Sequence, residues 1–271
     1  MTVGTNLFFI AALLLTLILT GTTVRADTSL NGLGDIGCND TAKKNLANLV
    51  TSKTPVLGAG DYRYDCKGET LKPLWDKIPI KHGVYGNHDV ESTASKTFTK
   101  YIMGISDKGW YSWKLNDIGI IGINVYQDFK KGSIQNDYIK LKSDQFCGRT
   151  DINWVIYNLH EPFNTPTVIG GHGPNKAVRS EIGPIIAACD KTENVLVVEG
   201  HNHITAFGNI DGINHAICGG GGKGGDGLGN LNGFEYGSTK PGYCDFSFTN
   251  TTATVQHVGT DNKIVKEFAF Y

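Results

Sequence analysis

From about residue 30 to residue 205, short apolar runs alternate with amphipathic stretches. The apolar runs predict buried strands at 30–34, 55–59, 80–85, 118–125, 152–159 and 195–199. The amphipathic stretches predict helices at 40–52, 69–77, 92–103, 133–146 and 177–189. This alternation of strand and helix is typical of an α/β fold with largely buried strands.

Two parts of the chain depart from this pattern. Within 110–125, two strand-like runs flank Asn116-Asp117, which predicts an antiparallel hairpin. After residue 205 the pattern changes to strand and turn alone, with predicted strands at 205–210, 213–218, 243–250, 252–258 and 263–270. The sequence contains neither a long linker nor an internal repeat, so we expect one domain built from two packed sheets.

The amino terminus resembles a leader for export. Residues 7–19 form an apolar run that is shorter than the ~20 residues of a membrane span. The small residues around Ala26 predict a signal peptide at 1–26, and a single domain at 27–271. The first six residues lack Lys and Arg, so an uncleaved anchor is the alternative. Both interpretations place the rest of the chain outside the cytoplasm, without stable membrane insertion if the leader is cleaved.

Composition agrees with a secreted globular protein. The 271 residues are 40% hydrophobic and carry a net charge of −1, with no basic run of the kind that binds nucleic acid. The sequence predicts up to three disulfides, because the count of six cysteines is even. The sequence contains no Cys-x-x-Cys pair, so we do not expect a thiolate zinc site. The triplets that begin at Asn39 and Asn250 match the acceptor pattern for N-glycosylation.

Residues that commonly bind metals follow the predicted strands. They are Asp35, Asp61, Asn87, His88, His160, His201 and His203. Because the carboxyl ends of strands in an open α/β sheet share one crevice, we expect these side chains to converge. Imidazole and carboxylate are ligands of zinc, iron and manganese. A carboxylate such as Asp61 can bridge two cations about 3.5–4 Å apart, which generate a hydroxide near neutral pH and clamp phosphoryl oxygens.

Glycines at 219–229 (GGGGKGGDGLG) form another candidate motif, a phosphate-binding loop. The required Ser or Thr does not follow the Lys, and no helix start follows the loop. We therefore interpret this segment as a mobile loop.

Five ordered blocks give the sequence a family resemblance. They are Gly34-Asp35-Ile36-Gly37, Gly60-Asp61, Gly86-Asn87-His88-Asp89, His160 and Gly200-His201-Asn202-His203. In this order they resemble the signature of the calcineurin-like metallophosphoesterase superfamily, over nearly the whole mature chain. Many members of the superfamily have a His ligand two residues after the first Asp, where this sequence has Gly37. The second block has Tyr64 three residues after Asp61, as in purple acid phosphatases, and this tyrosine could replace the missing ligand. The resemblance implies a four-layer α/β/β/α sandwich of two mixed sheets flanked by helices.

The resemblance also implies two sets of metal ligands. Ferric iron would be bound by Asp35, Asp61, Tyr64 and His203. Ferrous iron, zinc or manganese would be bound by Asp61, Asn87, His160 and His201. Tyr62 is the neighbour that competes with Tyr64 for this assignment, and a Tyr64 that merely packs against the loop is the alternative.

Catalytic residues follow from the same resemblance. His88 would contact the substrate phosphate and protonate the leaving oxygen, and Asp89 would orient it. His172 is a candidate for a second substrate contact. We therefore expect a secreted acid phosphatase-like enzyme, in which a metal-bound hydroxide attacks small phosphate monoesters. A phosphodiesterase or nucleotidase at the same site and an inactive metal-binding protein are the alternatives.

Overall fold

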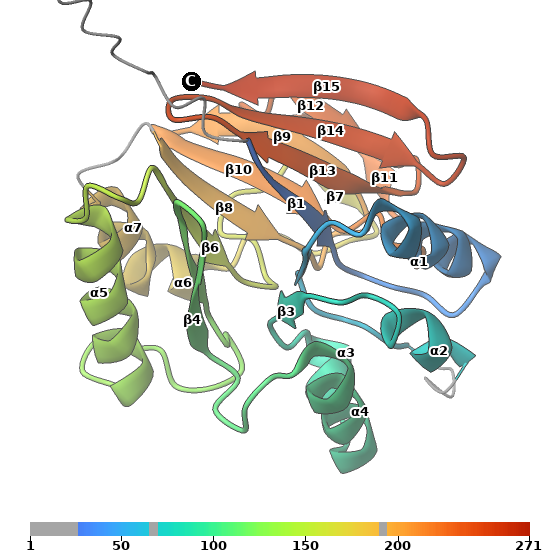
Figure 1. Ribbon diagram of the computed structural model, residues 1–271, viewed down its shortest axis with the longest axis horizontal. Coiled ribbons are helices and arrows are strands. Elements are labelled where there is room, and N and C mark those ends of the chain that lie inside the picture. The colour runs from blue at the N-terminus through green and yellow to red at the C-terminus, as the bar shows by residue number, and fades with distance from the viewer. Residues whose placement is uncertain (1–26, 65–69, 190–193) are drawn as a thin grey trace, which may run out of the picture.

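Two β-sheets pack face to face, and helices cover their outer faces (Figure 1). The computed structural model describes residues 27–64, 70–189 and 194–271, so the predicted signal peptide at 1–26 lies outside the described residues. This arrangement confirms the predicted sandwich of two mixed sheets flanked by helices.

The first sheet joins the amino-terminal strands to the carboxyl-terminal ones. Within the described residues its order is β15 (Ile264–Phe270), β14 (Ala253–Gly259), β13 (Gly242–Phe248), β1 (Thr28–Leu33), β2 (Val56–Gly58) and β3 (Lys81–Gly83). β1, β2 and β3 are parallel to one another, whereas β13 to β15 are antiparallel to their neighbours. The sheet is therefore complete only when the last strands of the chain pair with the first one.

The second sheet contains the central strands. In the part of the chain that the structure describes, its order is β12 (Tyr236–Ser238), β9 (Thr205–Ile210), β10 (Ile213–Cys218), β8 (Val195–Glu199), β6 (Trp154–Asn158), β5 (Ile118–Gly122) and β4 (Tyr111–Leu115). β10, β8, β6 and β5 are parallel. β4 and β5 form the predicted antiparallel hairpin around Asn116. A two-stranded ribbon of β7 (Val168–Ile169) and β11 (Gly227–Leu228) lies apart from both sheets.

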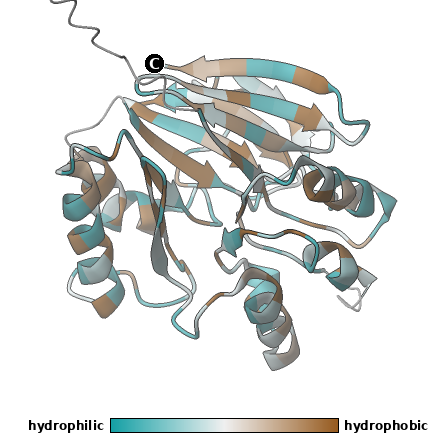
Figure 2. Ribbon diagram, in the orientation of Figure 1, coloured by the Kyte–Doolittle hydropathy of each residue, from teal (hydrophilic) through white to brown (hydrophobic). Residues whose placement is uncertain are grey.

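The main core lies between the two sheets. Leu30 and Phe246 of the first sheet and Ile120 of the second are among its fully buried side chains. A disulfide between Cys218, at the end of β10, and Cys244, in β13, links the sheets inside this core. Hydrophobic residues recur along the strands of both sheets (Figure 2). The strands β2, β5, β6 and β8 are buried at every position, whereas β15 at the edge of the first sheet is largely exposed.

Two groups of helices complete the layers. The first group is α1 (Asp40–Ser52), α2 (Lys72–Trp75), α3 (Asn87–Val90) and α4 (Thr93–Met103). The second group is α5 (Ile134–Cys147), α6 (Lys176–Glu181) and α7 (Gly183–Ala187). Leu46 of α1, Trp75 of α2 and Ile102 of α4 pack in one cluster with Leu33 of β1. A second cluster joins α5, α6 and α7 to β6 and β8.

Several predicted elements are shorter or divided. The predicted helix at 177–189 is two helices, because Pro184 lacks the N–H that would continue α6. The predicted helix at 69–77 is only α2, and the predicted strand at 80–85 is only β3. A second disulfide, Cys147–Cys189, links the ends of the helices on the second sheet. None of the helices in the described ranges has the length and apolar character to span a membrane.

Candidate metal centre

The predicted ligands lie where parallel strands of both sheets end. Asp35 follows β1, Asp61 follows β2, and Asn87 begins α3 shortly after β3. From the second sheet, His160 follows β6 and His201 follows β8. Residues that are more than a hundred positions apart in sequence thus meet at one edge of the sandwich.

The backbone at this edge is tight and unusual. Asp35, Asp61 and His201 have φ angles of 56°, 55° and 68°, in the left-handed region that side chains other than glycine rarely adopt. A Cβ on Gly60 would collide with the ring of His160, and one on Gly86 would collide with Asp61. These glycines are required because ligand segments from different strands touch across them.

One group of predicted ligands is centred on Tyr64. Its hydroxyl donates to Oδ1 of Asp35 at 2.9 Å and lies 3.0 Å from Nε2 of His203. Nε2 of His203 lies 3.8 Å from Oδ1 of Asp35. Tyr62 is fully buried against Trp75, and its hydroxyl accepts from the backbone N–H of Gly60. Of the two tyrosines, Tyr64 is the one in contact with predicted ligands.

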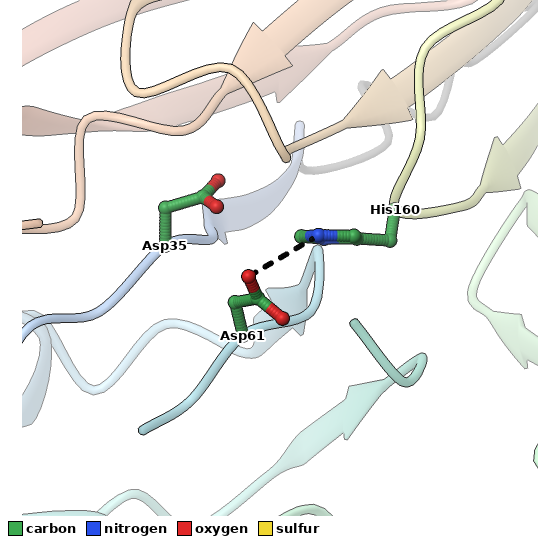
Figure 3. A group of neighbouring side chains, drawn as sticks. All are labelled: Asp35, Asp61 and His160. Atoms are coloured by element: carbon green, nitrogen blue, oxygen red, sulfur yellow. Dashed lines mark ion pairs between the residues drawn. The ribbon is translucent and has the colours of Figure 1, made fainter. Parts of the chain in front are cut away.

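A second group is centred on His160. Nε2 of this residue lies 3.4 Å from Oδ2 of Asp61, 3.3 Å from Oδ1 of Asn87 and 3.1 Å from Nδ1 of His201. Figure 3 shows the side chains of Asp35, Asp61 and His160 pointing toward one another. One ligand atom from each of these three residues lies within 4.8 Å of the others, so the two groups adjoin through Asp35 and Asp61.

Burial and the neighbouring charges shift the pKa values of the ligands in this centre. Burial opposes ionisation of Asp61, but the charge and hydrogen bond of His160 outweigh it and hold the pKa of Asp61 at about 2. Burial also opposes protonation of His160, yet the carboxylates, Asp61 first, raise its pKa to about 10. Burial and the charge of His160 lower the pKa of His201 to about 2. His201 is therefore a neutral imidazole, the form that binds metals.

The oxygen atoms of the centre fit a cation. Oδ2 of Asp35 is buried and has no hydrogen-bond partner among the described residues, which is costly unless a cation satisfies it. Burial raises the pKa of the Tyr64 phenol well above its usual range, and the charge of Asp35 raises it further. Loss of that proton requires a strongly charged ion at the oxygen. The donor set thus fits a divalent or trivalent metal.

Comparisons with known proteins place the fold. The sequence matches no family model and no curated protein. Purple acid phosphatase PPD1 from yellow lupin (Lupinus luteus) seeds is similar in structure, with a TM-score of 0.74, 14% identity, and coverage of 90% of this chain and 53% of that one. GAP50, described as the anchor in the inner membrane complex of Plasmodium, has a TM-score of 0.71, 14% identity, and coverage of 91% and 89%. PhoD has a TM-score of 0.63, 10% identity, and coverage of 90% and 69%.

This chain has the metallophosphoesterase fold. At such low identity the likeness concerns the fold, and the chain spans about half the length of the lupin enzyme. The metallophosphoesterase fold explains why the strand ends of both sheets meet at a single centre.

In this metallophosphoesterase fold, His88 lies at the rim of the centre. Its side chain is 33% exposed, and its ring lies 4.4 Å from that of Tyr64. Nδ1 of His88 contacts Oε1 of Glu91 at 2.8 Å. His172 also borders the centre, where its ring stacks on His201 at 4.1 Å. Both predicted catalytic histidines therefore lie beside predicted ligands.

The predicted role of Asp89 as the partner of His88 is wrong. The fully buried carboxylate of Asp89 accepts hydrogen bonds from the backbone N–H groups of Asp61, Tyr62 and Gly86, and from the hydroxyl of Thr99. The Asp89 carboxylate is not the partner of the His88 ring, because these four donors hold it inside the loop. Asp89 holds the loops that carry the ligands, and Glu91 is the carboxylate that contacts His88.

Sequence reasoning missed two residues at the centre. Asp226 accepts from the backbone N–H of His203 at 2.9 Å and lies 3.4 Å from Nδ1 of the same ring. Nζ of Lys223 lies 4.5 Å from the ring centroid of Tyr64. Both belong to the glycine run at 219–229, where the only signal was a pair of charges among glycines after a buried strand.

Proposed function

We propose that the protein is a phosphatase that hydrolyses small phosphate monoesters with the help of two metal ions. The observation that carries this proposal is the meeting of two ligand groups, centred on Tyr64 and His160, at the carboxylates of Asp35 and Asp61. Two adjoining cation sites with a shared carboxylate suit phosphoester hydrolysis, because both the attacking and the leaving oxygen need charge stabilisation.

Each metal has an assigned set of side chains. We assign Asp35, Tyr64 and His203 to ferric iron, and Asn87, His160 and His201 to ferrous iron, zinc or manganese. Asp61 would serve as a ligand in both sets. When bound, the metals activate a water molecule and neutralise the phosphate. The fit of a trivalent ion to the first set is supported by the phenol of Tyr64, which ionises only beside a strong positive charge.

The two rim histidines complete the assignment. His88 lies at the exposed side of the centre, where an incoming phosphate ester has access. It would hydrogen-bond the phosphate and protonate the leaving oxygen. His172, stacked on His201, would contact the substrate from the side of the second ligand set.

One purified sample tests the proposal. We expect two metal ions per chain, a visible tyrosinate-to-iron band, and hydrolysis of aryl phosphate monoesters faster than of bis-aryl diesters. The variant Asp61→Asn, which tolerates the left-handed backbone, should lose both metals and all activity. His88→Ala should keep the metals and lose about 10²- to 10⁴-fold in kcat. Far faster turnover of diesters would instead identify a phosphodiesterase.

A non-catalytic role is the second candidate. GAP50, described as an anchor, is covered over 89% of its length by this chain, so the two folds have nearly the same extent. A metal-loaded protein that hydrolyses neither monoesters nor diesters would favour this role. The presence of every predicted ligand and of His88 at the centre supports catalysis instead.

We also propose that the protein acts outside the cytoplasm after cleavage of the leader at 1–26. The disulfides Cys147–Cys189 and Cys218–Cys244 support an oxidising compartment. Mass spectrometry of the secreted protein would test this, because the proposal requires an amino terminus at Asp27. Glycans at Asn39 or Asn250 would be detected in the same experiment.

A further inference from the structure

Lys223 lies in a segment whose backbone is hydrogen-bonded to the loop of Asp35 in the metal centre. Its backbone N–H donates to the carbonyl of Asp35 at 3.0 Å. The backbone N–H of Gly221 donates to Gly34, and the amides of Asn45 and Asn39 donate to the carbonyls of Gly221 and Gly222. The prediction of a mobile loop is therefore wrong for residues 219–223.

Close packing explains the glycines before Lys223. A Cβ on Gly221 would collide with the carbonyl of Gly34, and Gly222 has a φ of 143° that other residues rarely adopt. A Cβ on Gly224 or Gly225, by contrast, would meet open space. The glycines on the amino-terminal side of Lys223 thus bring its backbone against the Asp35 loop, and its side chain starts from a defined position.

The side chain of Lys223 is exposed and reaches the ring of Tyr64. The same ring lies 4.4 Å from that of His88, the proposed phosphate contact. No carboxylate of the described residues lies within 4.0 Å of the Lys223 ammonium. Several other exposed lysines do have such partners; examples are Lys43, Lys72, Lys114 and Lys140. The charge of Lys223 is thus available to a ligand at the rim.

We propose that Lys223 binds a non-bridging oxygen of the substrate phosphate and makes the centre selective for dianionic monoesters. This inference rests on the proposed function and deepens it. A monoester carries nearly two negative charges above its second pKa of about 6, whereas a diester carries one. A cation at the rim therefore attracts the monoester more strongly. Lys223 touches the substrate and takes no part in the transfer of protons.

Substitution of Lys223 tests this selectivity at pH 7.5. In the metal-loaded protein, Lys223→Gln should lower kcat/KM for an aryl monoester roughly tenfold, mainly through KM, since the variant loses a charged hydrogen bond to the phosphate. The loss for a bis-aryl diester should stay below about threefold. Lys223→Arg should restore most of the monoester activity. The matched control is Lys266→Gln on β15, which lies at the opposite edge of the first sheet from β3. This variant should leave kcat/KM unchanged for both substrates.

Inorganic phosphate separates this inference from the proposed function. Calorimetry on the metal-loaded protein should give a Kd for phosphate that is roughly tenfold higher in Lys223→Gln than in the wild type, whether or not the protein hydrolyses esters. Equal phosphate binding in the two proteins would overturn the inference and leave the proposed function intact. An equal loss on both ester classes, or a loss of metal from Lys223→Gln, would also overturn it, because the lysine would then support the centre rather than recognise charge.

Discussion

The two nitrogens of the His203 ring face different partners. Nε2 lies beside Tyr64 and Asp35, and Nδ1 lies 3.4 Å from Oδ1 of Asp226. A carboxylate beside the far nitrogen of a metal-binding histidine orients the ring by its charge, and Asp226 also holds the segment of His203 by accepting from its backbone N–H at 2.9 Å. Asp226 thus has the position of a positioning residue for the proposed first metal.

Replacement of Asp226 should weaken metal binding without removing a ligand. We expect Asp226→Asn to raise the Kd for the first metal about 10- to 100-fold, measured by competition with a chelator. The control is Asp211→Asn, because Asp211 is exposed and pairs with Arg179 in a different part of the molecule. Equal metal affinity in wild type and Asp226→Asn would contradict this role.

A buried histidine outside the centre predicts a dependence of stability on pH. Burial, and then the charge of Lys240, lower the pKa of His257 to about 4, and Nδ1 contacts the hydroxyl of Tyr236. The unfolded chain binds a proton at His257 near pH 6.5, whereas the folded chain does not until about pH 4. Stability from this residue is therefore complete above pH 6.5 and is lost as pH falls toward 4.

Between pH 7 and pH 5, the wild type should lose about 2 kcal/mol more unfolding free energy than His257→Gln, which does not titrate. Urea denaturation at the two pH values measures this difference. Parallel losses in the two proteins would show that His257 does not titrate in the way the structure implies.

At the scale of elements, the disulfides Cys147–Cys189 and Cys218–Cys244 make different connections. Cys218–Cys244 joins the two sheets, while Cys147–Cys189 joins helices on the outside of one sheet. The chain separations of 26 and 42 residues are similar. Paired alanine variants should therefore lose similar unfolding free energy, roughly 3–4 kcal/mol each.

Metal affinity should separate these two pairs of variants. Cys218 directly precedes the glycine run that supports Lys223 and Asp226, so loss of its disulfide should weaken metal binding as well. The Cys147→Ala/Cys189→Ala variant serves as the control and should keep its metals. Unfolding curves and metal titrations on the same samples measure both effects. Equal metal affinity in the two variants would disprove the link.

Local signals explain which elements the sequence predicted well. The run from Asp40 to Ser52 is a helix with the predicted bounds, because Asn39 caps its first turn and the apolar spacing is regular. The turn glycines likewise marked the strand ends where ligands lie. The split at Pro184 was readable in the sequence, but amphipathic spacing continued across it and outweighed the proline.

The glycine run at 219–229 shows where local signals fail. Its first residues contact Gly34, Asp35 and Asn45, more than 170 positions away, and no periodicity encodes these contacts. The role predicted for Asp89 is wrong for a different reason. Four nearby donors compete for a carboxylate that the motif alone assigns to His88. Long-range backbone contacts and competition between donors are properties of the folded molecule.

At the scale of the whole molecule, the centre lies at the junction of two sheets. The first proposed ligand set takes Asp35 from the first sheet and His203 from the second, and the other set takes Asn87 and His160 in the same way. Each metal would therefore connect the sheets. Ligands that bind only the folded state stabilise it by mass action.

Removal of the metals should accordingly lower the melting temperature. At a free metal concentration of about 100 times Kd, binding at each site contributes about 2.7 kcal/mol, which corresponds to a shift of roughly 5–10 °C per site for a domain of this size. Differential scanning calorimetry with and without a chelator measures this shift. The variant Asp61→Asn should melt at one temperature in both conditions, and so should the wild type if the centre binds no metal.

The left-handed backbone at Asp35, Asp61 and His201 has a consequence for evolution in this fold. Each such residue costs about 1 kcal/mol or more relative to glycine, which adopts that conformation freely. Exchange to glycine at these positions would relieve that cost while removing a proposed ligand. Selection for stability of the metal-free chain would thus favour loss of the proposed ligands, and a descendant that kept only a scaffolding role would be expected to unfold at a higher temperature than the metal-free form of this protein.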